Sequence, residues 1–150
     1  MSLTETINEQ IKQAMKSGDK LRLDTLRTIR AGILEFEKSG LDRAMTPDDE
    51  FKILNSAAKK RKDAIEQYDA VGRQDASQRE RDELAIIMEF LPEQMSDDEI
   101  RAAVAEIAAQ VGATQQSDFG KLMGAATKAL KGKADGNAIQ QAAKALLSGQ

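Results

Sequence analysis

Four lysines and four glycines lie together in residues 119–136, FGKLMGAATKALKGKADG, and Asp135 is the one carboxylate among them. On a helix, residues spaced alternately three and four apart share one face, and that spacing relates Lys121, Gly124, Lys128 and Lys131. Lysines bind a polyanion by replacing its counterions, and a glycine between them leaves the backbone open to close approach. Spacing alone favours the plainer interpretation, a solvated face on which Gly120 and Gly124 allow tight helix packing.

The stretch GKADGN, residues 132–137, predicts a tight turn between two helices. The N-terminus of the second helix presents unpaired N–H groups and the positive end of its dipole, which favour an anion. Asp135 is a ready cap for the same N–H groups, so a phosphate would have to bind beside it. The purely structural interpretation is again the favoured one. If the turn binds RNA, the residues concerned are Lys131, Gly132, Lys133 and Gly136.

No nucleotide loop of a known kind is present. A Walker A motif ending at Gly132-Lys133 would need its first glycine at position 127, which is Thr127, and Ala134 follows the lysine. The sequence also contains no G-x-G-x-x-G motif. A nucleotide cofactor is therefore not expected.

Two further basic stretches are candidates. Arg27 and Arg30 adjoin on one helix face, in a segment that carries six cations against two aspartates between residues 12 and 30. They make a second surface that a polyanion could contact, although a solvated face is favoured. KKRK, residues 59–62, can instead form i,i+4 ion pairs, and we interpret it as a salt-bridged surface: Lys59–Asp63 and Lys62–Glu66.

Conventional catalytic groups are scarce. The chain contains no cysteine and no histidine, which excludes thiolate sites and removes the commonest general base and metal ligand. The carboxylate runs at 48–50 and 97–99 fall where the first turns of helices are expected, and there they match the helix dipole. We predict no catalytic residue, no metal site and no cofactor.

Apolar periodicity, caps and breakers predict seven helices and no strand. The expected helices cover about residues 2–17, 19–39, 47–71, 75–91, 97–111, 117–131 and 136–148. The two long helices at 19–39 and 47–71 are expected to pair as an antiparallel hairpin. The prediction is an all-α fold, with an N-terminal long helical hairpin region at 1–92 and a compact C-terminal three-helix bundle at 93–150.

Charge is unevenly distributed along the predicted bundle. Residues 97–118 carry five carboxylates and Arg101, whereas residues 119–150 carry five lysines and Asp135. No apolar run reaches the roughly 20 residues that span a bilayer, and the start MSLTETINEQ has no signal-peptide pattern. We therefore expect a cytoplasmic protein with no membrane partner.

Several stretches together resemble the YqeY family. They are LRLDTLRTIRAGI, RKDAIEQYDAVGRQD, EFLPEQMSDDEI and DFGKLMGAATKALKGKADG, in that order over nearly the whole chain. The family is similar to the C-terminal tail of GatB, a subunit that converts Glu- or Asp-tRNA to Gln- or Asn-tRNA. In that enzyme the tail contacts the tRNA elbow, and the chemistry resides in a cradle domain that has no counterpart in these 150 residues.

The resemblance implies an all-helical fold in two parts and places the basic turn of the tail at Lys131–Gly136. Family members commonly have a proline near Lys128 and an asparagine where Gln140 stands, so the sequence departs from the pattern at two positions. The first difference extends the helix that carries the lysines. The second puts in doubt any RNA-reading role taken from that asparagine.

Three hypotheses follow. The leading one is a non-catalytic module that binds tRNA or another structured RNA. The second is an accessory or subunit of a glutamine-dependent amidotransferase, a carbon–nitrogen ligase, which would need an amidotransferase or aminoacyl-tRNA synthetase partner and would be inactive alone. The third is a helical protein–protein adaptor, which an exposed apolar patch on the two long helices would favour.

Overall fold

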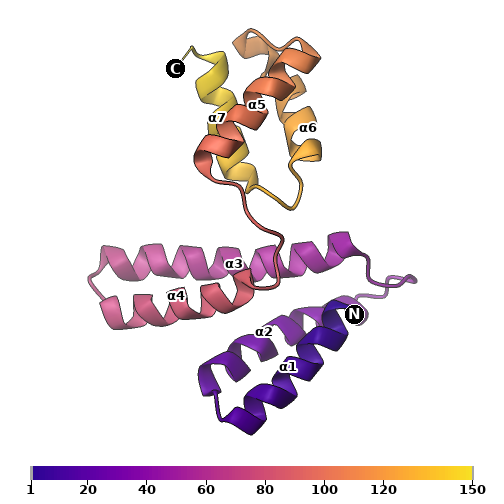
Figure 1. Ribbon diagram of the computed structural model, residues 1–150, viewed down its shortest axis with the longest axis vertical. Coiled ribbons are helices and arrows are strands. Elements are labelled where there is room, and N and C mark those ends of the chain that lie inside the picture. Colours follow the sequence, from indigo (N-terminus) through magenta and orange to yellow (C-terminus); the bar gives the residue numbers. More distant parts are fainter. Residues whose placement is uncertain (1, 150) are drawn as a thin grey trace. The chain divides into compact units, whose positions relative to one another are not determined.

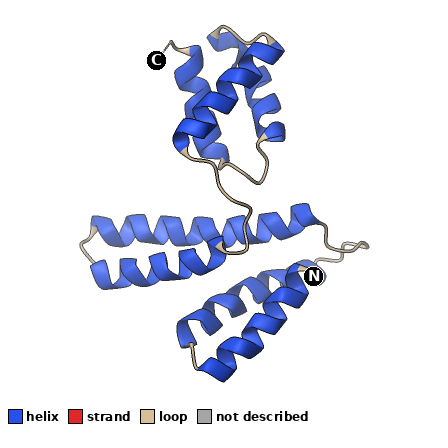
Figure 2. Cartoon of the chain, in the orientation of Figure 1, coloured by secondary structure: helices blue, strands red, loops and turns tan. Residues whose placement is uncertain are grey.

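The computed structural model describes residues 2–149, and within them every regular element is helical, as predicted (Figure 2). None of the helices in this range is long and apolar enough to cross a membrane. The elements are α1 Leu3–Ser17, α2 Lys20–Glu37, α3 Pro47–Ala70, α4 Gln74–Met88, α5 Asp97–Val111, the 3-10 turn η1 Gln116–Asp118, α6 Phe119–Ala129 and α7 Gly136–Leu147.

Helix ends follow the local signals in the sequence. The hydroxyls of Ser2, Thr46 and Ser96 each accept a hydrogen bond from the backbone N–H three residues later, where a carboxylate completes the capping box. Gly18 ends α1 and Gly112 ends α5, with φ angles of 76° and 73° that other residues rarely adopt. These signals fix the boundaries before any tertiary contact is considered.

The chain divides into two compact units, an N-terminal unit that ends at Leu91 and a C-terminal unit that begins at Pro92. In the N-terminal unit α1 lies along α2 and α3 lies along α4 (Figure 1). Its core is built from aliphatic side chains of all four helices, among them the fully buried Ile7, Leu26, Ile29, Ile33 and Ile87.

This pairing differs from the expected hairpin between the two long helices. The main neighbour of α2 is α1, and the main neighbour of α3 is α4. Gly18–Asp19 and Val71–Arg73 are the short connections in this unit, and such turns hold consecutive helices side by side. The connection between α2 and α3 is longer, residues 38–46, so it does not force these two helices to lie side by side. The two helices still meet where Gly32 faces Ile53, because a Cβ on Gly32 would lie 2.9 Å from the Ile53 Cγ2.

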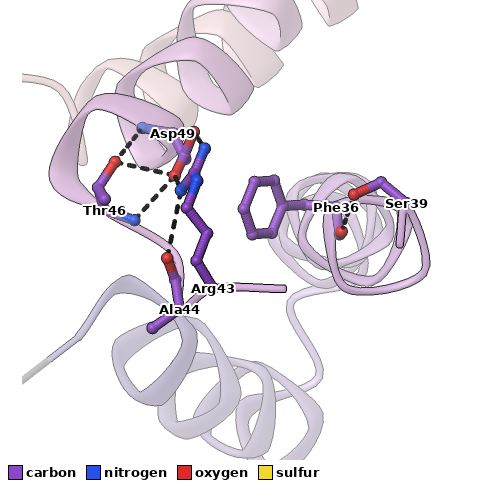
Figure 3. Close-up of polar contacts among 6 residues, drawn as sticks. All are labelled: Phe36, Ser39, Arg43, Ala44, Thr46 and Asp49. Carbon is purple, nitrogen blue, oxygen red and sulfur yellow. Dashed lines mark hydrogen bonds and ion pairs between the residues drawn. The ribbon is translucent and has the colours of Figure 1, made fainter. Parts of the chain in front are cut away.

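The loop at 38–46 is held to both helices by Arg43 (Figure 3). Its guanidinium lies 5.5 Å from the centre of the Phe36 ring and forms an ion pair with Asp49 at 2.5 Å. The Asp49 carboxylate also accepts hydrogen bonds from the Thr46 N–H at 2.9 Å and the Thr46 hydroxyl at 2.8 Å. Chiefly because of the Arg43 hydrogen bonds, the pKa of Asp49 lies far below its usual range.

The C-terminal unit packs α5, α6 and α7 against one another around a single core. Val104, Leu122, Ala126, Ile139 and Ala143 are almost completely buried, one or two from each helix. Small alanines allow the three short helices to approach closely, which offsets the scarcity of aromatic side chains.

Candidate nucleic-acid interface

Helix α6 separates an apolar face from a basic one, as the sequence pattern predicts. Leu122 and Ala126 are fully buried in the C-terminal core. Lys121, Gly124 and Lys128 are exposed. We call these three residues the lysine face, since two cations flank one glycine on the solvent side of the helix.

The helix is shorter than expected at both ends. Ser117 belongs to the 3-10 turn before α6, and α6 stops at Ala129, so Lys131 lies in the following turn. At its C-terminal end the chain reverses at Gly132, whose φ of 82° is a left-handed conformation that does not continue a helix. The face expected from Lys121 to Lys131 is therefore helical only as far as Lys128, and Lys131 belongs to the turn.

The glycines of α6 do not serve close packing. A Cβ placed on Gly120 or on Gly124 would meet no atom within 4 Å, and both residues are exposed. Each glycine costs about 0.5–1 kcal/mol relative to alanine in a helix. The packing interpretation considered from the sequence is thus wrong, and nothing within the C-terminal unit requires these two glycines.

The turn between α6 and α7, residues 131–136, is the basic turn of the molecule. Lys131, Lys133 and Gly136 are exposed, and Gly132 is half-buried. The Lys133 N–H donates to the Leu130 carbonyl at 3.0 Å, which closes the turn. Lys131 and Lys133 are the next lysines in the sequence after Lys128 of the lysine face.

Two residues that the sequence did not indicate hold the basic turn from outside. The Gln94 side-chain amide donates to the Gly132 carbonyl at 3.0 Å and to the Pro92 carbonyl at 2.7 Å. The Met95 N–H donates to the Lys133 carbonyl at 2.9 Å. We call this pair the clasp. Because the clasp satisfies backbone carbonyls, it fixes the main chain of the turn without engaging the lysine ammonium groups.

The N-terminus of α7 is closed by its own cap. The Asp135 carboxylate accepts a hydrogen bond from the Asn137 N–H at 3.4 Å, as predicted. The carboxylate that caps this helix end therefore lies two residues after Lys133 in the same turn. Beside the other end of the lysine face, the N–H groups of Thr114 and Gln115 and then the charge of Lys121 lower the pKa of Asp118.

The two arginines that the sequence analysis singled out lie on the N-terminal unit. Arg27 and Arg30 are exposed on α2, next to the buried Leu26 and Ile29. They belong to the unit of the chain that does not carry the lysine face.

The KKRK segment is paired differently from the expected pattern. Within residues 2–149, Arg61 is the member of this segment that forms an ion pair, with Glu83 of α4 at 3.4 Å. The predicted pairs Lys59–Asp63 and Lys62–Glu66 do not form in that range. The guanidinium of Arg61 thus links α3 to α4, while the flanking lysines stay in solvent.

The two carboxylate runs lie at the starts of helices. Asp48, Asp49 and Glu50 occupy the first turn of α3, and residues 97–99 occupy that of α5. In the described part of the chain, no group of three acidic side chains is arranged to hold a metal ion. The candidate site is accordingly a surface of lysines, glycines and backbone.

Comparison with known proteins identifies the family. The model of the family described as Yqey-like protein matches residues 4–147, nearly the whole chain. This chain belongs to the YqeY-like family. The YqeY-like chain is also similar to an uncharacterized protein of Schizosaccharomyces pombe, with 32% identity over 97 residues that cover 64% of this chain and 77% of that protein.

Proposed function

We propose that this YqeY-like protein is a non-catalytic module that binds tRNA or a similarly structured RNA through its C-terminal unit. The lysine face and the basic turn supply the phosphate contacts, with one ammonium group each from Lys121, Lys128, Lys131 and Lys133. Arg27 and Arg30 provide a second, separate surface for the same RNA.

The observation that carries the proposal is the exposed pair of glycines among the lysines. Gly120 and Gly124 cost helix stability and fill no packing role, because a Cβ on either would meet open space. A backbone laid bare between cations suits the close approach of a phosphate chain. The resemblance of the family to the tRNA-contacting tail of GatB supports RNA as that chain.

Filter binding of tRNA at several salt concentrations tests this proposal. The logarithm of the association constant should fall linearly with the logarithm of salt concentration, and the four lysines should contribute about −3 to the slope, in addition to the contribution of Arg27 and Arg30. Reversing two of the four lysine charges with Lys131→Glu and Lys133→Glu should halve the lysine contribution and weaken binding at low salt.

The matched control is Lys59→Glu with Lys62→Glu, which changes the net charge equally on exposed positions of α3. This control should retain most of the tRNA affinity. Absence of tRNA binding at low salt, or equal losses in the two double variants, would refute the proposed site.

A further inference from the structure

A groove runs between α2 and α3 in the N-terminal unit. It has a volume of about 350 Å³ and is lined by small and apolar residues of both helices, including Ala31, Gly32, Ile53 and Ala57. A second hollow shares Ala31 and Glu35 with it and continues along α2 past Leu34 to Lys38. From Thr28 to Lys38 the two hollows follow α2 for about 15 Å, or three helical turns.

The shape of this α2–α3 groove follows from its smallest residues. The helices touch at Gly32 and Ile53, and the short side chains of Ala31 and Ser56 beside that contact leave space above it. The ion pair of Arg43 with Asp49 holds the connecting loop to α3, and its contact with Phe36 holds the loop to α2. These contacts within the fold therefore keep the groove in shape.

The chemistry of the lining is apolar along the bottom and cationic along the α3 side. Lys52 and Lys60 are exposed, lie about 12 Å apart along α3, and form no ion pair within residues 2–149. Across both hollows the lining carries three lysines (Lys38, Lys52 and Lys60) against a single carboxylate, Glu35, while Arg61 is paired with Glu83. Leu34 adds an apolar side chain that is 41% exposed at one end.

We propose that the α2–α3 groove binds an amphipathic helix of a partner protein, one that carries two acidic residues about two turns apart beside its apolar face. The apolar face would lie on Ile53, Ala57 and Leu34, and the acidic residues would pair with Lys52 and Lys60. This is the helix-in-groove mode of recognition, in which anchors recur at i, i+3 or i+4 and i+7.

Two observations favour a protein helix over RNA at this surface. The groove lining contains no aromatic side chain on which a base could stack. Its length of about three turns and its apolar bottom match the apolar stripe of one short helix. The inference concerns the N-terminal unit and stands independently of RNA binding by the C-terminal unit.

Selection from a displayed library of random 16-residue peptides on the full chain tests this proposal. The enriched sequences should repeat apolar residues at helical spacing and carry Asp or Glu beside them. The most enriched peptide, labelled with fluorescein, is then titrated by fluorescence anisotropy. Lys52→Glu with Lys60→Glu should weaken its binding at least about tenfold, since two ion pairs become repulsive.

Two further variants separate charge from shape. Lys59→Glu with Lys62→Glu changes the same net charge on the same helix outside the groove, and should alter the affinity by less than about threefold. Ala31→Trp fills the groove from an exposed helix position without changing any charge, and should abolish binding while circular dichroism shows unchanged helicity.

Three results would overturn the proposal: no enriched peptide, enriched peptides without acidic residues, or equal affinity for the groove and control variants. Binding of a random-sequence 12-nucleotide RNA that both groove variants abolish, with no peptide bound, would assign the groove to nucleic acid instead.

Discussion

Asp135 has opposing effects on α7 and on an approaching phosphate. Its carboxylate caps the helix, and its charge repels an anion from the basic turn. Asparagine caps a helix about as well as aspartate does but carries no charge. Asp135→Asn should therefore raise tRNA affinity by about two- to fivefold in filter binding, with the urea midpoint nearly unchanged. Weaker binding by this variant would show that Asp135 supports the RNA contact rather than opposing it.

Asp49 makes the stability of the N-terminal unit depend on pH. Because its pKa is lower in the folded chain than the usual value near 3.9, its contribution is complete above about pH 5. That contribution is lost as the pH falls toward the folded pKa. Asp49→Asn should lower the urea midpoint at pH 7, and the difference from the unaltered protein should shrink between pH 5 and pH 2.

The matched control for this experiment is Asp42→Asn, which removes a carboxylate from an exposed position in the 38–46 loop next to Arg43. It should change the midpoint less than Asp49→Asn at every pH. An equal effect of the two substitutions would indicate a general charge effect instead of the Arg43–Asp49 contact.

At the level of the helix, α6 carries a glycine whose removal should separate stability from binding. A Cβ on Gly124 meets open space, so Gly124→Ala should raise the free energy of unfolding of the C-terminal unit by about 1 kcal/mol. If a phosphate chain approaches the bare backbone, the same change should weaken tRNA binding. Urea denaturation and filter binding measure the two effects. A rise in stability with unchanged affinity would remove Gly124 from the interface.

Helix boundaries could be predicted from the sequence because they depend on neighbouring residues. Ser96 and Gly112 mark the start and end of a helix by their own chemistry, and α5 begins and ends beside them. Pro92 marks the end of the preceding helix less exactly, because α4 already stops at Met88. The pairing of α2 with α1 follows the short connection Gly18–Asp19, which the sequence marks with a glycine. The packing of α2 on α3 could not be predicted in the same way, because no local pattern indicates a contact such as Gly32 with Ile53.

The candidate site was predictable to a similar extent. The spacing of Lys121 and Lys128 identified an exposed face, because helical periodicity is a local property. Gly132 indicates that the helix ends nearby, but a glycine does not fix how many residues of turn precede it, and α6 stops at Ala129. The bond from Gln94 to Gly132 joins residues 38 positions apart, and a glutamine in a connecting segment carries no signal for such a contact.

At the level of the whole molecule, the two units have separate cores and should unfold separately. Leu122 is fully buried in the C-terminal core, so Leu122→Ala should cost that unit about 2–5 kcal/mol. Hydrogen exchange measured by mass spectrometry on the full chain should show lost protection in α5, α6 and α7. Protection of α1–α4 should stay the same. Equal loss in both units would contradict their independence.

The clasp has a consequence for how the C-terminal unit can be transplanted. Gln94 and Met95, which hold the basic turn, come within four residues of the start of the unit at Pro92. A fusion protein in which the foreign chain is joined at Pro92 keeps both residues of the clasp. A fusion joined at Ser96 keeps every helix of the unit but lacks Gln94 and Met95, so the hydrogen bonds of the clasp to the basic turn are lost. The part of the chain that keeps the basic turn held by these hydrogen bonds therefore begins before α5, at or before Gln94.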